Sequence, residues 1–347
     1  MNSFTNLTPD SLREQADAAQ RLGPQRRTRE LAAHLGVSEC ELVHAQYEGL
    51  SSQALQGSMS EMFSALSSLG PVMALTRNDW CVHERHGSYE GHVGQGHVHM
   101  MLGPDIDLRA FIGVWRHAYA VEQGGRRSLQ FFDGSGLAVH KVYCTAQTDE
   151  HAYVAYVSRF AAAAPQPPVV RPAAVAGQVE PKSSPEQIRA AWLALQDTHD
   201  FYPMLRRLGI SRLQALAAAG ADLAQPVPAD SVERILTSAA QSGLAIMCFV
   251  GNPGMVQIHT GPVHQLRRTG DWYNVLDKNF NLHLNTAAAS SWVVNKPTTD
   301  GWVRSLELYH ESGEQIVQFF GRRKEGQTEL AEWRALLDEL CSEPLAV

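Results

Sequence analysis

Among the residue types that can bind metals or transfer protons, histidine is the one most clearly clustered in the first half of the chain. His83, His86, His92, His97 and His99 fall within one short stretch. In the segment HVHM, His97 and His99 alternate, so on a strand both would face the same side, as two metal ligands can. No cysteine or carboxylate stands at a familiar ligand spacing, and the stretch is rich in glycine. The pattern therefore favours solvated histidines in an exposed hairpin over a metal site.

Another histidine, His199, stands apart in the second half. Residues 184–187, SPEQ, have the N-cap serine, the first-turn proline and the capping-box glutamine of a helix start. The helix is expected to run on through His199 and to bend or stop near Pro203. Trp192 and Leu195 would then share a face with His199. Such a histidine is usually a core or boundary residue, but a neutral imidazole on an apolar helix face also suits axial ligation of haem iron.

The familiar nucleotide and nucleophile motifs are absent from the sequence. There is no P-loop and no G-x-S-x-G elbow, and Gly94 and Gly96 in HVGQGHVHM do not open a helix. The five scattered cysteines never form C-x-x-C, which indicates reduced thiols and no zinc site. These observations give no support for nucleotide binding, nucleophilic catalysis or structural zinc.

Residues 30–45, ELAAHLGVSECELVHA, resemble a helix-turn-helix. A recognition helix must meet phosphates, yet SECELVHAQ carries two glutamates and neither lysine nor arginine, and the chain has a formal net charge of −7. A structural helical hairpin is the preferred interpretation. DNA binding remains a distant alternative, and no stable nucleic-acid binding is expected.

The elements that must position these residues occur twice, because residues 73–136 recur between 247 and 313. The offset is 174 at first and 177 after a three-residue insertion, as expected for a duplicated domain. Equivalent pairs include Met73/Met247, Asn78/Asn252, Leu102/Leu276, Trp115/Trp292 and Gly136/Gly313.

Each copy begins with helical segments, continues with short apolar stretches broken by turn residues, and closes on an amphipathic helix. Alternating runs between turns indicate antiparallel hairpins. The predicted fold class is α+β: a tandem duplication of a domain with a large antiparallel sheet flanked by helices. We expect an N-terminal repeat over 1–160, a Pro/Ala-rich linker over 161–185 and a C-terminal repeat over 186–347.

Composition sets the broad class of the protein. At 347 residues the chain has room for two domains, and its apolar and charged fractions are those of a globular protein. The N-terminus lacks a basic region followed by an apolar stretch, and no apolar run is long enough to span a bilayer. The expectation is a soluble, cytoplasmic protein that is not an integral membrane protein.

Several segments in the right order resemble the bacterial cytoplasmic haemin-transport and haemin-degrading proteins of haem-uptake operons. In the first copy they are ALTRNDWCVHE, IDLRAF and SLQFFDGSG. In the second they are DTHDFYPMLRR, IMCFVGNPGMVQIHTG, NKPTTDGWVRSLEL and FFGRRKEG. The resemblance covers nearly the whole chain, including the duplication.

The resemblance implies one haem (iron protoporphyrin IX) per chain, in a cleft between the C-terminal half and part of the N-terminal half. His199 in DTHDF would be the iron ligand. Arg109 in DLR would reach the distal face, where it is also the candidate catalytic residue. The remaining cofactor-binding positions by motif are Arg212, Lys296 and Arg323, which are basic, and Phe249 and Gln257, which line the pocket.

These roles agree with elementary chemistry. Arginine binds carboxylates bidentately, and a distal arginine donates hydrogen bonds without being a strong iron ligand. His199 and Arg109 each belong to one copy only, because Arg26 and His283 stand at their repeat positions. The family often has tyrosine where this chain has Phe320, so any step that needs a phenol there is in doubt.

Two functions follow from the resemblance. In the first, the protein would take up imported haem for trafficking and iron release and would itself degrade haem oxidatively, as an oxygenase that uses an external reductant and dioxygen. The alternative is a pure carrier that delivers haem to a separate haem oxygenase. Expected partners are haem, an inner-membrane haem importer or a downstream oxygenase, and an electron donor if the protein is an enzyme. Both functions need the same pocket, so the sequence leaves open whether the protein is an enzyme.

Overall fold

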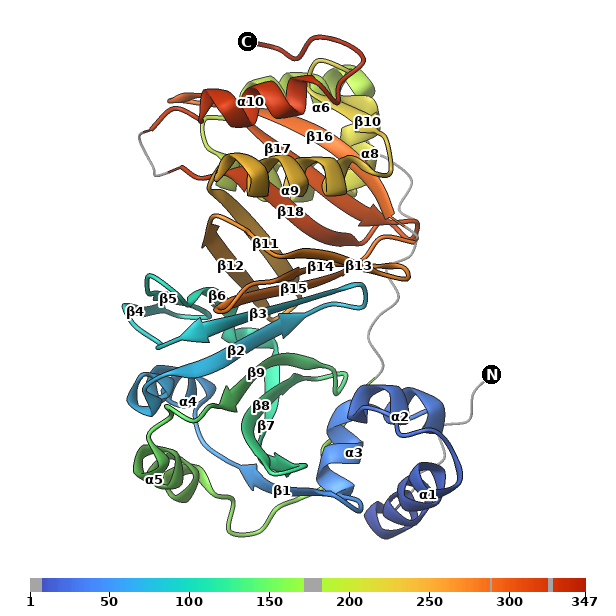
Figure 1. The fold of residues 1–347 in the computed structure, drawn as a ribbon, viewed down its shortest axis with the longest axis vertical. Helices are drawn as coiled ribbons and strands as arrows, with labels where there is room; N and C mark the ends of the chain where they lie inside the picture. Colours follow the sequence, from blue (N-terminus) through green and yellow to red (C-terminus); the bar gives the residue numbers. More distant parts are fainter. Residues whose placement is uncertain (1–7, 172–182, 288, 324–326) are drawn as a thin grey trace. The chain divides into compact units, whose positions relative to one another are not determined.

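The computed structural model describes residues 8–171, 183–287, 289–323 and 327–347, which form two compact units (Figure 1). Of these residues, unit 1 comprises 8–77, 84–171 and 252–257. Unit 2 comprises 78–83, 183–251 and those from 258 onward. Each unit therefore includes one short segment from the opposite half of the sequence.

Unit 1 contains helices before and after a run of antiparallel strands. Its helices are α1 (Pro9–Leu22), α2 (Thr28–Leu35), α3 (Glu39–Ala45), α4 (Met59–Ala65), η1 (Leu66–Leu69), η2 (Ile112–Val114) and α5 (Glu150–Phe160). Its strands are β1 (Leu50–Leu55), β2 (Val72–Arg77), β4 (His92–Gln95), β5 (Val98–Leu102), β6 (Asp107–Phe111), β7 (Trp115–Gln123), β8 (Arg126–Asp133) and β9 (Ala138–Cys144). Strand β3 (Cys81–Gly87) belongs partly to each unit.

Unit 2 repeats this plan. Its helices are α6 (Pro185–Leu193), η3 (Thr198–Asp200), α7 (Phe201–Leu208), α8 (Arg212–Ala218), α9 (Ser231–Ser242) and α10 (Ala331–Asp338). Its strands are β10 (Ala224–Val227), β11 (Ile246–Asn252), β13 (Leu266–Thr269), β14 (Trp272–Leu276), β15 (Phe280–Asn285), β16 (Ala289–Thr298), β17 (Gly301–His310) and β18 (Gln315–Gly321). Strand β12 (Met255–Gly261), like β3, belongs partly to each unit.

The strand order is the same in both units. In unit 1 the neighbours run β1-β7-β8-β9-β2-β3, and in unit 2 they run β10-β16-β17-β18-β11-β12. A smaller set of strands also has the same order in both units. Its neighbours run β12-β6-β5-β4 in unit 1 and β3-β15-β14-β13 in unit 2. Neighbouring strands such as β7 with β8 and β16 with β17 pair in antiparallel fashion. The predicted α+β tandem duplication with large antiparallel sheets is confirmed.

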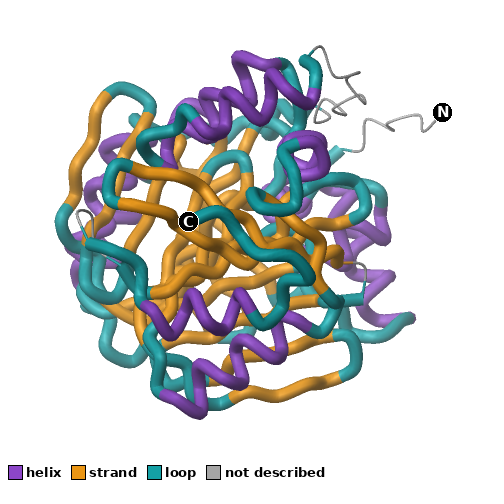
Figure 2. Tube along the Cα trace, turned by 90° about the horizontal axis from the view of Figure 1, so that it is seen from above, coloured by secondary structure: helices purple, strands orange, loops and turns teal. Residues whose placement is uncertain are grey.

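In each unit, helices pack against both faces of the main sheet. Figure 2 shows the helices in purple and the strands in orange. In unit 1, Ala120 and Phe131 pack with α4 and α5, whereas Tyr119 and Phe132 pack with α1 to α3. Because neighbouring residues of a strand face opposite sides, one strand supplies both cores. In unit 2 the cores lie between the sheet and α9 with α10, and between the sheet and α6 to α8.

The helical hairpins at the start of each copy are specified by their local sequence. Ser38 and Ser211 cap α3 and α8, and each takes part in a capping box with a residue three positions on. The preceding helices end at Gly36 and Gly209, both in the left-handed conformation that favours glycine. The predicted hairpins are confirmed.

The exchanged segments are held by equivalent asparagines. Asn78 donates from Nδ2 to the carbonyl oxygens of Gly251 and Ile316, at 3.2 and 2.8 Å, all within unit 2. Asn252 donates to the carbonyl oxygens of Arg77 and Val139, both at 2.9 Å, within unit 1. The acceptor residues are themselves related by the repeat offsets. The exchange of segments is therefore present in both copies of the duplicated domain.

Two further expectations from the sequence concern the linker between the copies and the absence of membrane-spanning segments. The linker predicted over 161–185 falls in part on 172–182, which lie outside the described residues, and its end at Ser184 caps α6 as expected. The boundaries at 160 and 186 stay a prediction. Within the described residues, no helix is both long and apolar enough to cross a membrane.

Candidate functional site

His199 lies at the surface of unit 2 with its ring fixed by a carboxylate. Its side chain is 93% exposed, and its Nδ1 lies 2.6 Å from Oδ1 of Asp197. The same oxygen accepts the backbone N–H of His199 at 2.7 Å. An ionised carboxylate only accepts hydrogen bonds, so Nδ1 carries a proton, and Nε2 is the ring nitrogen that faces solvent. The backbone hydrogen bond of His199 is the main cause that lowers the pKa of Asp197, and Arg323 adds to it.

The predicted extent of the helix that carries His199 is wrong. Helix α6 ends at Leu193, and His199 lies in the short helix η3, whose N-cap is Asp197. Pro203 lies in the first turn of α7, where its missing N–H costs no hydrogen bond, instead of ending a helix. Trp192 is fully buried whereas His199 is exposed, so the two do not share a face. The helical period fails because capping by Asp197 restarts the chain in a new direction.

The segment before His199 is anchored on both sides. Gln196 accepts a backbone hydrogen bond from Thr299 at 2.9 Å. Trp192 donates from Nε1 to the Asn295 carbonyl at 2.9 Å and packs edge-on against Phe201. A ligand that binds Nε2 of His199 would therefore meet a side chain on a supported backbone.

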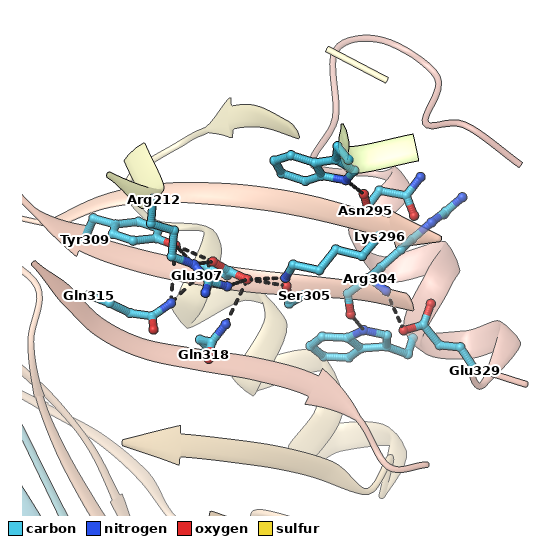
Figure 3. A network of polar contacts seen from close by, with 12 residues as sticks. Arg212, Asn295, Lys296, Arg304, Ser305, Glu307, Tyr309, Gln315, Gln318 and Glu329 are labelled. Carbon is cyan, nitrogen blue, oxygen red and sulfur yellow. Dashed lines mark hydrogen bonds and ion pairs between the residues drawn. The ribbon is translucent and has the colours of Figure 1, made fainter. Parts of the chain in front are cut away.

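Arg212 and Lys296 converge on one buried carboxylate, Glu307 (Figure 3). Arg212 binds it bidentately, with Nε 2.9 Å from Oε2 and Nη2 2.8 Å from Oε1. Lys296 donates from Nζ to Oε1 at 3.0 Å. Both cations also lie over the ring of Phe201, at 4.8 and 4.9 Å from its centroid. Tyr309 donates to Oε2 and accepts from Nε of Arg212 at 2.6 Å.

Burial and charge act against each other in this cluster. Burial lowers the pKa of Lys296 to about 8, although Glu307 partly opposes that effect. For Glu307, burial alone would raise the pKa, but Arg212 and Lys296 hold it well below its ordinary value. Burial also raises the pKa of Tyr309 well above its ordinary value. At neutral pH the cluster therefore contains an ionised glutamate and a neutral phenol beside two cations.

The sequence analysis missed Glu307 and Asp197. The signal for Glu307 is a glutamate between Leu306 and Leu308, in a strand whose residues are buried on both faces. The signal for Asp197 is an aspartate two positions before a histidine, which favours a local hydrogen bond to the backbone.

Three other predicted residues occupy different settings. Phe249 on β11 packs edge-on against Phe320 on β18, with ring centroids 5.2 Å apart. Gln257 is fully buried in unit 1 and donates from Nε2 to the Ala74 carbonyl at 3.0 Å, while its Oε1 has no hydrogen-bond partner among the described residues. Arg323 follows β18 and contributes to the lowered pKa of Asp197.

Arg109 lies on the outer face of the β4–β5–β6 set in unit 1. It forms an ion pair with Asp107 and keeps 32% of its side chain exposed. The antiparallel register places Val98 and Leu102 on the same face, together with Phe111, and these apolar side chains are 46%, 47% and 37% exposed. Asp107 lies on this face beside Arg109. An exposed apolar face that carries a guanidinium can receive an apolar ligand and donate hydrogen bonds to a polar atom on it.

The histidines near residue 90 are not solvated as a group. His83 is fully buried, and His97 lies in the turn between β4 and β5, not on a strand. His99 is 6% exposed, and its ring fills the space over Gly94. It contacts Ser60 through Nε2 at 3.2 Å and His92 through Nδ1 at 3.1 Å. The expectation of surface histidines was wrong for His83 and His99, and the described residues contain no group of three or more ligands suited to a metal ion.

The helical hairpin of unit 1 turns its second helix inward. Glu39, at the start of α3, is 3% exposed and forms ion pairs with Arg77 and Lys141. Five of the seven residues of α3 are buried. A recognition helix must present its side chains to a groove, so the structure supports the structural interpretation of this hairpin.

Comparison with known proteins identifies the family. The model of the haemin-degrading HemS/ChuX domain matches residues 36–160 and 209–340. The chain belongs to the haemin-degrading HemS/ChuX family. The two matches of this family model fall on the two copies of the repeat.

Relatives in the HemS/ChuX family match over nearly their whole length. The haemin transport protein HemS of Yersinia enterocolitica is 39% identical over 342 residues, which cover 97% of this chain and 99% of the relative. The structure of apo-PhuS, a haem-binding protein from Pseudomonas aeruginosa, is 41% identical with a TM-score of 0.91, over 96% and 99% of the two chains. ChuS, an Escherichia coli haem oxygenase, is 33% identical with a TM-score of 0.86, over 95% and 99%.

Proposed function

We propose that this protein binds haem as cargo, with His199 as the axial ligand of the iron. The observation that carries the proposal is the geometry of His199, whose Nδ1 is held by Asp197 while Nε2 faces solvent. Histidine ligands of metals characteristically donate their second ring N–H to a carboxylate or carbonyl, which fixes the tautomer and the ring. The chain thus offers a preoriented imidazole nitrogen with no competing partner among the described residues.

Other residues supply what a porphyrin needs. We propose that Arg109 and the exposed apolar side chains around it meet the distal face of the macrocycle. Arg212, Lys296 and Arg323 supply positive charge for the two propionates. Phe249 contributes an aromatic wall, and the buried carbonyl oxygen of Gln257 has no hydrogen-bond partner within the described part of the chain. Since His199 and Arg109 each occur in one copy only, the expected stoichiometry is one haem per chain.

The proposed role is uptake of imported haem in the cytoplasm, for trafficking and iron release. It rests on the family and on relatives described as haemin transport and haem-binding proteins. All five cysteines are free thiols, in keeping with a reducing compartment. The partners would be a haem importer in the inner membrane and, downstream, a haem oxygenase or an electron donor.

The proposal also includes oxidative degradation of haem by this protein. One relative is described as a haem oxygenase, whereas others are described only as transport or binding proteins. When bound, haem with reduced iron supplies the oxygen chemistry, and the protein's own contributions are the axial imidazole and the donor Arg109. Phe320 packs against Phe249 and has no hydroxyl, so this chain has no phenol at that position. A pure carrier uses the same His199 and differs only in leaving the macrocycle intact.

Haem titration tests the axial ligand. Wild type is expected to give the Soret and visible bands of an imidazole-ligated haem at one equivalent per chain, and His199→Ala is expected to lose them. His264→Ala is the matched control, because His264 is also exposed in unit 2 and no described side chain binds its ring. A His199→Ala spectrum identical to that of wild type would overturn the assignment.

A second experiment separates enzyme from carrier. The haem complex is supplied with a reductase, dioxygen and catalase, and carbon monoxide and other ring-opening products are measured. Product formation that survives catalase, and that Arg109→Ala reduces, supports degradation. If catalase abolishes the bleaching, peroxide is the agent and the carrier is the correct interpretation.

A further inference from the structure

A buried contact between a phenol and an imidazole lies in unit 1, apart from the residues assigned to haem. The hydroxyl of Tyr89, in the loop after β3, lies 2.6 Å from Nε2 of His140 on β9. Nδ1 of the same ring lies 2.9 Å from Oγ1 of Thr76 on β2. All three side chains are at most 1% exposed. Tyr89 and His140 thus form a buried phenol–imidazole pair.

The second copy of the repeat shows that packing does not require these polar groups. At the repeat positions of Thr76, Tyr89 and His140 stand three valines: Val250, Val263 and Val317. The valines are equally buried and belong to one apolar core of unit 2. Buried polar groups must be hydrogen-bonded to be tolerated, whereas apolar side chains carry no such requirement. The fold therefore forms with an apolar core at these positions, and the pair is specific to unit 1.

The imidazole of the pair is neutral and offers Nε2 as a base. Burial lowers the pKa of His140 to about 3, although a backbone hydrogen bond to Leu75 partly opposes that effect. A bond that favours the protonated ring must use the Leu75 carbonyl, which only accepts. Leu75 and Thr76 are adjacent on β2, so the ring N–H lies on the Nδ1 side. Burial raises the pKa of Tyr89 well above its ordinary value, so the phenol keeps its proton and donates it to Nε2.

The pair lies behind the face of the small sheet that carries Arg109. Tyr89 packs in the same core as Leu108 and Ala110 of β6. Neighbouring residues of a strand point to opposite faces, so Arg109 projects away from this core. A ligand on the Arg109 face would be separated from Tyr89 by one layer of the structure, about 10 Å thick. An electron can cross a layer of this thickness by tunnelling.

We propose that Tyr89 is a reversible one-electron donor to haem that hydrogen peroxide has oxidised, with His140 as the acceptor of its proton. The inference rests on the proposed haem function. Peroxide is reduced to water as it oxidises the haem, and one electron then passes from the phenol of Tyr89 to the oxidised haem. The O–H bond of Tyr89 breaks, its proton forms an N–H bond at Nε2 of His140, and a neutral phenoxyl radical remains. An external electron donor reduces the radical, and the proton returns to the phenol oxygen.

The base beside a phenol decides whether that phenol can be oxidised. A phenol that loses an electron becomes a strong acid, and an imidazole takes its proton whereas a backbone carbonyl does not. Tyr156 provides the contrast, because it is 3% exposed and donates to the Met62 carbonyl at 2.9 Å. The imidazolium formed at His140 is a buried charge and therefore costly, which favours return of the proton once the radical is reduced. The pair thereby diverts an oxidising equivalent away from the macrocycle.

The experiment mixes the haem complex with hydrogen peroxide, freezes it rapidly and records the electron paramagnetic resonance spectrum. Wild type is expected to give a phenoxyl signal that narrows when the protein contains ring-deuterated tyrosine. Tyr89→Phe should lose this signal, and its haem should bleach faster. His140→Val, which introduces the residue of the second copy, should also lose the signal although the phenol remains. Tyr156→Phe is the matched control and should keep it. A merely structural role of His140 would leave the signal of His140→Val unchanged.

A measurement on wild type keeps the test decisive if these variants fold poorly. The phenoxyl oxygen of Tyr89 should accept a hydrogen bond from the new N–H of His140. Electron–nuclear double resonance should therefore detect a proton coupled to the radical that exchanges in heavy water, and histidine labelled with nitrogen-15 should identify its carrier. Tyr119 lies 3.2 Å from Nδ1 of His44, a longer contact, so Tyr119→Phe should keep the signal.

The outcomes separate the inference from the proposed function. A radical signal that survives in Tyr89→Phe, or that disappears in Tyr119→Phe, would place the radical on another residue and overturn the inference. If wild type shows the His199-dependent Soret band but forms no phenoxyl radical with peroxide, the inference is wrong while haem binding stands. If wild type gives no His199-dependent Soret band, the proposed function itself fails.

Discussion

Glu39 and Arg212 occupy the same position in the two copies and carry opposite charges. Each is the first residue of the second helix in its helical hairpin, directly after the capping serine. Glu39 pairs with Arg77 and Lys141 in unit 1, and Arg212 pairs with Glu307 in unit 2. The duplication has thus kept a buried ion cluster between hairpin and sheet but reversed the sign of the helix residue. The charge at the start of the second helix in each helical hairpin is therefore complementary only to the sheet of its own unit.

Replacing Glu39 by glutamine should destabilise unit 1 by about 3–5 kcal/mol at pH 7, because two buried cations lose their partner. The pKa of Glu39 is lowered to about 2 because Lys141 and Arg77 outweigh the opposing effect of burial. Its contribution is therefore complete above pH 4.5 and is lost as pH falls towards 2. Urea denaturation between pH 2 and 7 should show that Glu39→Gln lacks this acid dependence.

The control for that experiment is Glu48→Gln. Glu48 pairs with Arg21, but both side chains are about two-thirds exposed. Exposed pairs contribute roughly 0–1 kcal/mol. Equal losses of stability in the two variants would show that burial of Glu39 is not what matters.

Substitution of Asp197 by asparagine should weaken haem binding roughly 10–100-fold, because the imidazole of His199 loses the carboxylate that fixes its tautomer. The measurement is the dissociation rate of haem, followed by transfer to an excess of an apo-haem acceptor protein. Asp200→Asn provides the comparison, since Asp200 is exposed and binds no side chain within the described residues. An unchanged dissociation rate in Asp197→Asn would contradict the orienting role.

Gly254→Ala should destabilise the exchanged segment of unit 1. A Cβ at this position would lie 2.7 Å from Val139 and 3.1 Å from Nε1 of Trp115, whose indole donates to the Gly254 carbonyl at 2.9 Å. Overpacking of this kind costs about 1–3 kcal/mol. Thermal unfolding is compared with Gly134→Ala, where the nearest atom is 3.6 Å away and little change is expected. Equal melting temperatures for the two variants would show that the segment tolerates the extra methyl group.

Glu329→Gln should stabilise the protein at alkaline pH. Burial raises the pKa of Glu329 to about 7, and its Oε2 has no hydrogen-bond partner among the described residues. A raised pKa favours folding fully below the unfolded value of 4.5, and this advantage is lost as pH rises through 7. The variant should gain up to about 3 kcal/mol over wild type between pH 5 and 8. A free energy of unfolding that changes with pH equally in both proteins would refute the role of Glu329.

Local signals in the sequence predicted the elements with short-range causes. The capping box at Ser184 predicted the start of α6, and the helix-turn-helix pattern of residues 30–45 predicted the hairpin of α2 and α3. The hairpin of β8 and β9 follows from alternation around Gly136, which adopts the left-handed conformation. Each of these features depends on residues a few positions apart.

Periodicity failed where a side chain redirected the backbone. The helical pattern through Trp192 predicted one long helix, but Asp197 caps a new one and leaves His199 exposed. Likewise, a glycine-rich stretch suggested solvated histidines, yet His99 is buried over Gly94 because glycine leaves room for its ring. Both errors come from contacts that a regular period cannot encode.

By itself the sequence determined that the chain is a duplication, that each copy is α+β, and that His199 and Arg109 each occur in one copy only. Only the tertiary structure decided that Asn78 and Asn252 hold segments exchanged between the units, and that Arg212 and Lys296 meet at Glu307. The physical reason is the range of the interactions. Repeats, caps and turns are set by neighbours along the chain, whereas buried charges are paired by strands and helices that the sequence places far apart.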